Sequence, residues 1–185
     1  MPKKLIIGLV GEIACGKDTV AAYLKKKYGA ETISFSQPLR DILDRIFLPQ
    51  TRENMAKLGI ALRGIFGQDM LSRVIADEVR ASKKKIAVLP NVRLQSDIVH
   101  LQNEPGFILI NVDADIKKRF ERIKNRGQNA DDKGKTWAEF LKDAKLPTEI
   151  QIRKLAKKCK YKLDNNGSQK DLIQQIDKLM KKIKA

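Results

Sequence analysis

The chain has 185 residues, and its 38 Lys and Arg against 22 Asp and Glu give a formal net charge of +16. This length favours one domain with its own core. A composition of 42% hydrophobic and 32% charged residues excludes both a disordered acidic tail and a membrane bundle. Two cysteines, Cys15 and Cys159, are too few for a disulfide-rich secreted fold or a four-cysteine zinc site. The excess positive charge is compatible with a nucleic-acid partner, because Lys and Arg release counterions from phosphates.

The first segment does not resemble a targeting signal. Lys3 and Lys4 precede an apolar run at residues 5–10, and this run stops at Gly11 and Glu12. It is shorter than the ~7–15 residues of a signal-peptide core, and no run approaches the ~20 apolar residues of a spanning helix. We therefore expect a cytoplasmic protein without a membrane partner.

Apolar runs and turn residues predict strands that alternate with helices along the chain. Residues 4–10 are typical of a parallel strand buried on both faces, and residues 18–28 have helical spacing that ends at a Gly29 C-cap. Further strands are expected at residues 32–35, 86–89, 108–112 and 161–163. Further helices are expected at residues 38–46, 51–84 with a break at 64–67, 115–125, 137–141 behind a Thr136–Glu139 capping box, and 169–184.

This alternation predicts the fold class. Strands separated by helices form a three-layer α/β sandwich, in this chain around a five-stranded parallel sheet. We expect one domain over residues 1–185, with a helical acceptor-binding insertion at residues 36–84 and a lid loop at residues 126–136.

The segment between the first strand and the first helix has the pattern of a phosphate-binding loop. Gly11 and Gly16 enclose a short loop that ends in Lys17. Glycines allow successive N–H groups to turn toward a polyphosphate, the helix N-terminus adds partial positive charge, and the lysine reaches the β- and γ-phosphates. Lys17 is accordingly a predicted catalytic residue. The residues expected to bind ATP here are Gly11, Ala14, Cys15, Gly16, Lys17, Asp18 and Thr19.

One position departs from the strict Walker A motif. Asp18 stands where that motif has Ser or Thr, whose hydroxyl ligates Mg²⁺. We expect Asp18 to act on the metal through water. Cys15 is interpreted as a packing residue because no partner for a nucleophile is evident, and His100 is the single histidine, expected on a helix surface. A Ser-His or Cys-His hydrolase is therefore disfavoured.

The loop and several later segments resemble a known group of kinases. Residues 16–21, Gly-Lys-Asp-Thr-Val-Ala, are similar to the P-loop of phage-type deoxynucleoside monophosphate kinases and their dephospho-CoA kinase-like relatives. Further similar segments lie at residues 35–40, 58–63, 90–93 and 165–172. The resemblance covers nearly the whole chain. It implies a P-loop NTPase fold, ATP and Mg²⁺ as cofactors, and direct in-line transfer to a nucleoside or deoxynucleoside monophosphate.

The resemblance also assigns roles in donor binding. It implies that Asn165, Gly167 and Ser168 contact the donor adenine, although an ordinary turn explains these residues equally well. The Arg-x-x-x-Arg spacing of Arg122 and Arg126 is similar to the lid entrance of adenylate kinases.

The lid arginines also share a face with a third arginine. Arg119 lies one turn before Arg122, so Arg119, Arg122 and Arg126 share a helix face. We expect Arg119 and Arg122 to bind ATP, and Arg122 and Arg126 to clamp the transferring phosphoryl group. The alternative is a solvated basic face.

The absence of a carboxylate after the second strand indicates the kind of acceptor. A hydroxyl acceptor needs a base to take its proton, whereas a phosphate acceptor needs only alignment and neutralisation. Residues 34–37 after the second strand contain no carboxylate, which favours a nucleoside monophosphate. Arg40, Arg63 and Arg93 are the residues expected to bind its phosphate. Asn91 replaces an Asp of the family signature, which weakens the metal site.

Two alternatives remain open. One is transfer to a hydroxyl, as in dephospho-CoA kinases. The other is a basic P-loop ATPase associated with nucleic acid, because residues 151–185 contain 11 Lys and Arg against 3 Asp. Tyr161 is the single aromatic residue in that segment, so it offers no stacking platform, and nucleic acid is possible but not favoured.

Overall fold

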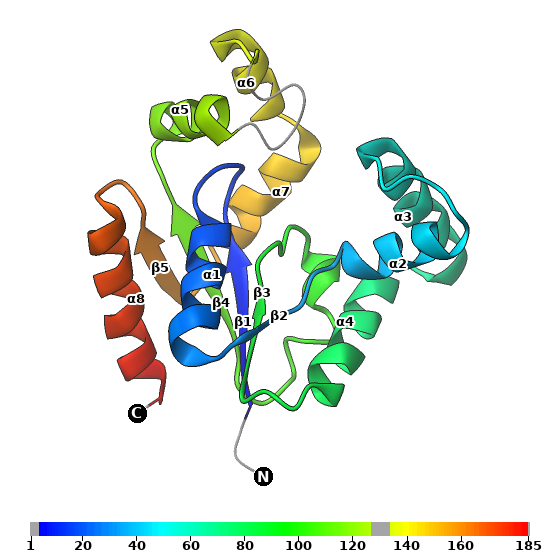
Figure 1. The fold of residues 1–185 in the computed structure, drawn as a ribbon, viewed down its shortest axis with the longest axis horizontal. Coiled ribbons are helices and arrows are strands. Elements are labelled where there is room, and N and C mark those ends of the chain that lie inside the picture. Colours follow the sequence, from blue (N-terminus) through cyan, green and yellow to red (C-terminus); the bar gives the residue numbers. More distant parts are fainter. Residues whose placement is uncertain (1–3, 127–133, 185) are drawn as a thin grey trace.

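Continuous apolar runs form the strands of the central sheet. The computed structural model describes residues 4–126 and 134–184, and within them five parallel strands pair in the order β2-β3-β1-β4-β5 (Figure 1). The strands are β1 Leu5–Val10, β2 Glu31–Thr32, β3 Ile86–Leu89, β4 Phe107–Asp113 and β5 Tyr161–Asp164. Residues 6–10 of β1 are all buried, as a central strand covered on both faces requires.

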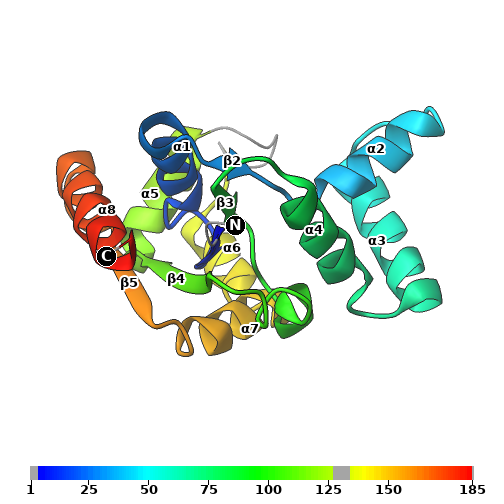
Figure 2. The same ribbon diagram turned by 90° about the horizontal axis from the view of Figure 1, so that it is seen from below.

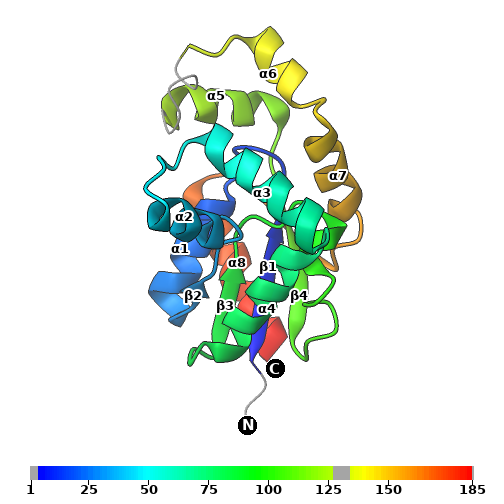
Figure 3. The same cartoon turned by 90° about the vertical axis from the view of Figure 1, so that its right-hand side faces the viewer.

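Helices cover both faces of this sheet. The helices are α1 Lys17–Tyr28, α2 Gln37–Arg45, α3 Arg52–Phe66, α4 Met70–Ala81, α5 Ile116–Arg126, α6 Trp137–Asp143, α7 Pro147–Ala156 and α8 Gln169–Lys184, with a 3-10 helix at Gln95–Ile98. α1 and α8 pack on one face, and α4 and α7 pack on the other (Figure 2). α5 and α6 lie beyond the carboxyl end of the sheet, as Figure 3 shows. The predicted three-layer sandwich is confirmed.

The second strand is shorter than the sequence predicts. β2 ends at Thr32, and only the amide of Ile33 continues the pairing, by donating to the Val88 carbonyl at 2.9 Å. Ser34 and Ser36 then share a hydrogen bond between their hydroxyls at 3.0 Å, and the Ser36 amide donates to the Ser34 hydroxyl. Serine side chains compete with strand pairing for backbone hydrogen bonds, so the chain turns here. The side chains of Ile33 and Phe35 nevertheless remain buried.

Helix boundaries follow capping residues. α3 begins after Thr51, whose hydroxyl accepts from the Asn54 amide, and it ends at Gly67 with φ of 98°. Thr136 and Glu139 form the predicted capping box of α6. Asp115 caps α5 by accepting from the Lys117 amide at 2.8 Å.

α7 was not predicted. It has Pro147 in its first turn, which is compatible with a helix start. Its two buried side chains, Ile152 and Leu155, are too few to stand out as a periodic pattern.

The insertion divides into two parts. α4 packs onto the sheet through side chains such as Ile75 and Val79, whereas α2 and α3 project away from it (Figure 2). Phe47, in the α2–α3 connection, is 93% exposed and has a left-handed φ of 58°. Residues 127–133 of the predicted lid lie outside the described residues. Within the described ranges, no helix has the length and apolarity that crossing a membrane requires.

Candidate active site

The loop between β1 and α1 lies at the carboxyl end of the sheet and depends on its glycines. Gly16 has a left-handed φ of 104°, and a Cβ there would lie 2.2 Å from Asn165 Nδ2. A Cβ on Gly11 would lie 2.3 Å from the Val112 carbonyl oxygen. Asn165 Nδ2 also donates to the Cys15 carbonyl at 2.8 Å. No larger residue fits at either glycine without displacing backbone or this amide contact.

Lys17 lies folded across the loop. Its ammonium donates to the Gly11 carbonyl at 2.6 Å and to the Glu12 carbonyl at 3.1 Å. It also lies 3.6 Å from Cys15 Sγ. Burial raises the pKa of the Cys15 thiol and outweighs the opposing charge of Lys17, so this thiol stays protonated near neutral pH. Cys15 is 1% exposed and is a packing residue, as predicted.

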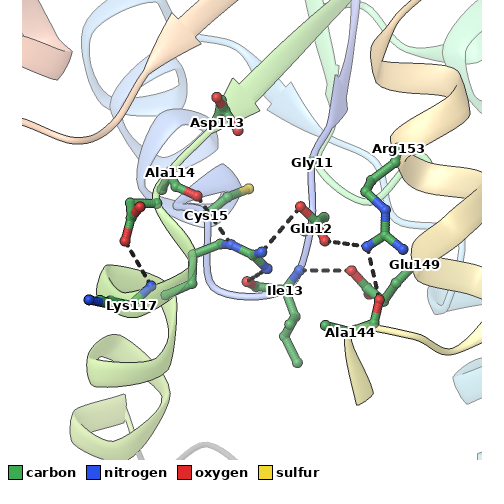
Figure 4. A network of polar contacts seen from close by, with 12 residues as sticks. Gly11, Glu12, Ile13, Cys15, Asp113, Ala114, Lys117, Ala144, Glu149 and Arg153 are labelled. Atoms are coloured by element: carbon green, nitrogen blue, oxygen red, sulfur yellow. Dashed lines mark hydrogen bonds and ion pairs between the residues drawn. The ribbon is translucent and has the colours of Figure 1, made fainter. Parts of the chain in front are cut away.

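The first half of the loop is joined to α5 and α7 through one carboxylate (Figure 4). Glu12 Oε2 lies 3.1 Å from Arg119 Nη2, and Glu12 Oε1 lies 2.7 Å from Arg153 Nη1. The Glu12 side chain is 19% exposed and the Arg119 side chain 4%. Arg119 also donates to the Ala114 carbonyl at 3.2 Å, and Arg153 to the Ala144 carbonyl at 2.9 Å. The carboxylate therefore bridges two cations from different helices.

A second carboxylate approaches the same half of the loop. Glu149 of α7 accepts from the Ile13 amide at 3.3 Å (Figure 4). No sequence pattern indicates Glu12, Glu149 or Arg153 as residues of this site. Glu12 was recognised only as a loop position, and the two α7 residues lacked a predicted helix to place them.

A small cavity lies next to this network. It has a volume of about 220 Å³ and is lined by the loop, the end of β4, α5 and α7, including Glu12, Asp113, Arg119 and Arg153. Small-molecule sites typically measure ~300–1,000 Å³, so the cavity matches phosphate groups better than a whole nucleotide. Its position agrees with the rule that ligands of open α/β sheets bind beyond the carboxyl ends of the strands.

The α5 arginines contact the loops of the site. Arg119 is buried and its guanidinium lies 5.7 Å from the Phe140 ring centroid, so the alternative of a solvated basic face is wrong for this residue. Arg122 Nη2 donates to the Asn165 carbonyl at 2.8 Å, and its Nη1 is buried without a hydrogen-bond partner. The side chain of Arg126, at the end of α5, lies outside the described residues.

The loop before α8 combines a site contact with a helix cap. Asn165 is 7% exposed and holds the Cys15 carbonyl, as described above. The hydroxyl and amide of Ser168 donate to Asp171 Oδ2 at 2.7 Å and 2.8 Å, and these bonds lower the pKa of Asp171. A Cβ on Gly167 would lie 2.7 Å from the same oxygen. Gly167 and Ser168 thus form the turn that caps α8, and of these three predicted residues Asn165 contacts the phosphate loop.

Two of the three predicted acceptor arginines lie near one buried carboxylate. Asp97 is 6% exposed and accepts from the amides of Arg93 and Leu94 at 2.9 Å and 2.8 Å. Burial raises the pKa of Asp97, and these amides and the charges of Arg63 and Arg93 oppose that rise. Arg63 Nε is buried without a hydrogen-bond partner. Arg40 is separate, because its Nη1 donates to Gln50 Oε1 at 2.7 Å.

The chemistry of the site suits a hydrated metal ion better than a protein cage. In the described part of the chain no three His, Cys, Asp or Glu side chains gather at one point. Asp18 is exposed beside Lys17, and Asp113 pairs with Lys162 at 2.8 Å. Mg²⁺ usually keeps several waters and takes one or two carboxylates, so Asp18 fits an outer position. His100, predicted on a helix surface, instead lies in a turn and contacts Asp69 at 2.6 Å.

Comparison with curated proteins reveals relatives along most of the chain. No protein-family model matches it. The "UPF0200 protein" of Thermococcus kodakarensis is 27% identical over 184 residues, which cover 97% of this chain and 98% of that protein. The UPF0200 protein of Thermococcus sibiricus is 30% identical over 141 residues, which cover 74% of this chain and 73% of that protein. The chain belongs to the UPF0200 family. That family name states no activity.

Solved structures share the fold. TT1252 from Thermus thermophilus has a TM-score of 0.65 at 20% identity and covers 97% of this chain and 98% of its own. Shikimate kinase from Bacteroides thetaiotaomicron has a TM-score of 0.64 at 14% identity, with 98% and 99% covered. The sheet with helices on both sides is therefore the shikimate kinase-like P-loop NTPase fold. The nucleoside monophosphate kinase family suggested by sequence resemblance stays a prediction.

Proposed function

We propose that this protein is an ATP-dependent phosphotransferase that transfers a phosphoryl group from MgATP to a nucleoside monophosphate. The observation that carries the proposal is the phosphate loop, where Lys17 lies across two loop carbonyls and both glycines are required by close contacts. A triphosphate offers Lys17 stronger acceptors than these carbonyls. Anionic oxygens at a helix N-terminus are also favoured by the α1 dipole.

The residues around the loop fit a bound triphosphate. Arg122 Nη1 is buried beside the loop before α8 and has no hydrogen-bond partner, which a phosphate oxygen would satisfy. Arg119 and Arg153 are held by Glu12 at the edge of the small cavity. Bound Mg²⁺ would neutralise charge on the transferring group, and Asp18 would hold its water shell.

The roles of the chain's own residues follow from this arrangement. Lys17 binds the β- and γ-phosphates and stabilises charge that develops on transfer. Arg122 contacts the donor from α5, Arg119 supports the loop beneath it, and Arg126 is the third expected cation. Arg63 and Arg93 converge near Asp97 and would bind the acceptor phosphate, with Arg40 as an outer contact.

A nucleoside monophosphate fits because the position after β2 offers no base. Asp41, the nearest carboxylate there, is exposed on α2 and accepts from Gln37 at 2.8 Å. Asp97 is engaged by two loop amides. A phosphate acceptor is already an oxyanion, so charge neutralisation and alignment suffice for in-line transfer.

A second candidate is transfer to a hydroxyl group. Glu12 and Glu149 place two carboxylates at the loop, and a carboxylate beside a reacting hydroxyl acts as a general base. The solved relatives named shikimate kinase, one of them in complex with shikimate, share this fold. However, Glu12 is occupied by two arginines and Glu149 by a loop amide, which leaves the first candidate better supported.

An acceptor screen tests the proposal. Purified protein with ATP and Mg²⁺ is incubated with nucleoside and deoxynucleoside monophosphates, dephospho-CoA or shikimate, and in parallel reactions with RNA or DNA. Products are followed by ³¹P NMR. We expect ADP and a nucleoside diphosphate to appear in equal amounts with at least one monophosphate. Transfer to dephospho-CoA or shikimate alone would establish the second candidate. ATP turnover that appears only with RNA or DNA would overturn both in favour of a nucleic-acid-associated ATPase.

A further inference from the structure

A larger basic groove lies at the opposite, amino-terminal end of the sheet. Its volume is about 880 Å³, and the start of β1 and the end of α8 lie on this side of the molecule, away from the phosphate loop (Figure 1). Five lysines line it: Lys4, Lys83, Lys84, Lys85 and Lys182. No Asp or Glu is among its described lining residues. We call it the amino-end groove.

Most of this charge is not balanced by ion pairs within the described part of the chain. Among the described residues, the side chains of Lys83, Lys84 and Lys85 form no ion pair, whereas lysines elsewhere do. Lys27 pairs with Asp177 at 2.6 Å, for example. Like charges that share a concave surface raise its positive potential and attract a counter-anion. An anion from solution could therefore bind these lysines without displacing an ion pair of the described residues.

The segment that carries the three lysines is anchored. Lys4 Nζ donates to the Ser82 carbonyl at 2.5 Å and to the Val79 carbonyl, which fixes the end of α4. The Leu5 amide donates to the Lys85 carbonyl at 2.9 Å, which fixes the start of β3 beside β1. The backbone that presents the lysines is thus held in place before any ligand arrives, which lowers the entropy cost of binding.

The aromatic residues of the groove do not form a stacking platform for bases. The ammonium groups of Lys160 and Lys182 lie over the Tyr161 ring, 5.7 Å and 5.9 Å from its centroid. The Tyr28 hydroxyl donates to Asp177 Oδ1 at 2.8 Å. Proteins that bind single-stranded nucleic acid combine a basic groove with aromatic faces on which successive bases stack, and the cations over Tyr161 therefore favour a small ligand here. The volume also falls within the ~300–1,000 Å³ of small-molecule sites.

We propose that the amino-end groove binds a small, phosphate-rich anion that carries three or more negative charges. Its phosphate oxygens accept hydrogen bonds from Lys83, Lys84 and Lys85, and Lys182 closes the opposite side. This second anion site is independent of the phosphate loop and of the reaction proposed there.

Amide chemical shifts test the proposal, because they separate the two sites within one sample. Isotope-labelled wild-type protein is titrated with inorganic tripolyphosphate, and shifts are followed at residues 83–86, 106–108 and 161 as well as at the phosphate loop. The test variant is the triple substitution Lys83→Gln, Lys84→Gln, Lys85→Gln. The matched control is Lys25→Gln, Lys26→Gln, Lys178→Gln, which changes exposed lysines outside the groove by the same charge.

We expect saturable shifts at the groove residues in the wild type, at least tenfold weaker binding there in the test variant, and at most a twofold change in the control. Shifts confined to the phosphate loop, or an equal loss in both variants, would overturn the proposal. A ten-nucleotide RNA that shifts the groove residues while tripolyphosphate does not would also overturn it, in favour of nucleic acid. If tripolyphosphate shifts the groove residues of the wild type but not the phosphate loop, the result would contradict the proposed function and still support the proposal for the groove.

Discussion

The two ends of the sheet both carry cationic side chains, but these differ in whether a carboxylate pairs with them. At the carboxyl end, Arg119 and Arg153 are held by the Glu12 carboxylate beside a cavity of about 220 Å³. At the amino end, Lys83 and Lys84 line a groove of about 880 Å³, and no ion pair engages them within the described ranges. Both ends are cationic, yet among the described lining residues only those at the carboxyl end pair a cation with a carboxylate.

This difference shows how a single net charge can serve two purposes. Buried arginines near a phosphate loop need a partner when no ligand is bound, because an isolated buried charge is costly. Exposed lysines are solvated by water and need no charged partner. At the carboxyl end the arginines therefore form ion pairs with Glu12, whereas at the amino end the lysines are exposed to solvent and to dissolved anions.

The largest expected effect concerns Lys17 at the carboxyl end. The substitution Lys17→Ala removes the one ammonium that lies across the loop carbonyls, and we expect phosphoryl transfer to fall by about 100-fold or more. Circular dichroism should show an unchanged fold, since the side chain is not part of the core. Transfer rates within threefold of wild type would show that the loop does not bind the donor phosphates as proposed.

The next effect tests whether the Glu12 network stabilises the carboxyl end. Glu12→Gln leaves the buried Arg119 without its charged partner, and we expect a loss of about 1–3 kcal/mol in the free energy of unfolding. Urea denaturation measures it. The control Glu53→Gln breaks an exposed pair with Lys57 and should cost less than about 0.5 kcal/mol. Equal losses in both variants would mean that the network contributes no more than a surface pair.

At the amino end we expect a smaller effect on stability, and there the substitution stabilises the fold instead of destabilising it. The triple substitution of Lys83, Lys84 and Lys85 by Gln relieves like-charge repulsion, so at low salt the melting temperature should rise by about 2 °C or less. Added sulfate should stabilise the wild type more than this variant. A clear fall in melting temperature would show that these lysines already have partners, which would remove the contrast between the two ends.

The smallest effect lies beside the amino-end groove, where the half-buried Asp177 forms an ion pair with Lys27. The hydrogen bond from Lys27, with those from Tyr28 and Tyr23, lowers the pKa of Asp177 to about 2. A carboxyl whose folded pKa lies below its unfolded value of about 3.9 contributes stability above that pH and loses it as the pH falls toward 2.

Asp177→Asn should therefore remove part of the acid-induced loss of stability between pH 4 and pH 2. Urea midpoints measured from pH 5 to pH 2 compare the variant with the wild type. Parallel curves for the two proteins would indicate that Asp177 has the same pKa in the folded and unfolded chains.

Much of the fold was predictable because its signals are local. The run at residues 5–10 specifies a buried strand, and the loop that ends in Lys17 requires a strand before it and a helix after it. Errors arose where local signals were weak or competed. The serines at 34 and 36 shortened β2 through hydrogen bonds with each other, and α7 carries only two buried apolar residues.

The candidate site was predictable in part for the same reason. Arg122 was identified from spacing on one helix, and the structure places it beside Asn165, another predicted residue. The pair of Glu12 and Arg153 joins residues 141 positions apart, so no spacing pattern points to it. Their roles in catalysis stay predictions that the acceptor screen and the variants address.

The sequence by itself determined the parallel sheet, the position of the phosphate loop and the excess of positive charge. Only the tertiary structure decided which cations are neutralised, because ion pairing depends on the distance between segments that are remote along the chain. It brought Glu12 to arginines of α5 and α7. It also gathered lysines from three separate segments, residues 4, 83–85 and 182, into one groove whose described lining residues include no Asp or Glu. A count of charges along the sequence does not show which cations become paired and which become exposed together, because folding decides both.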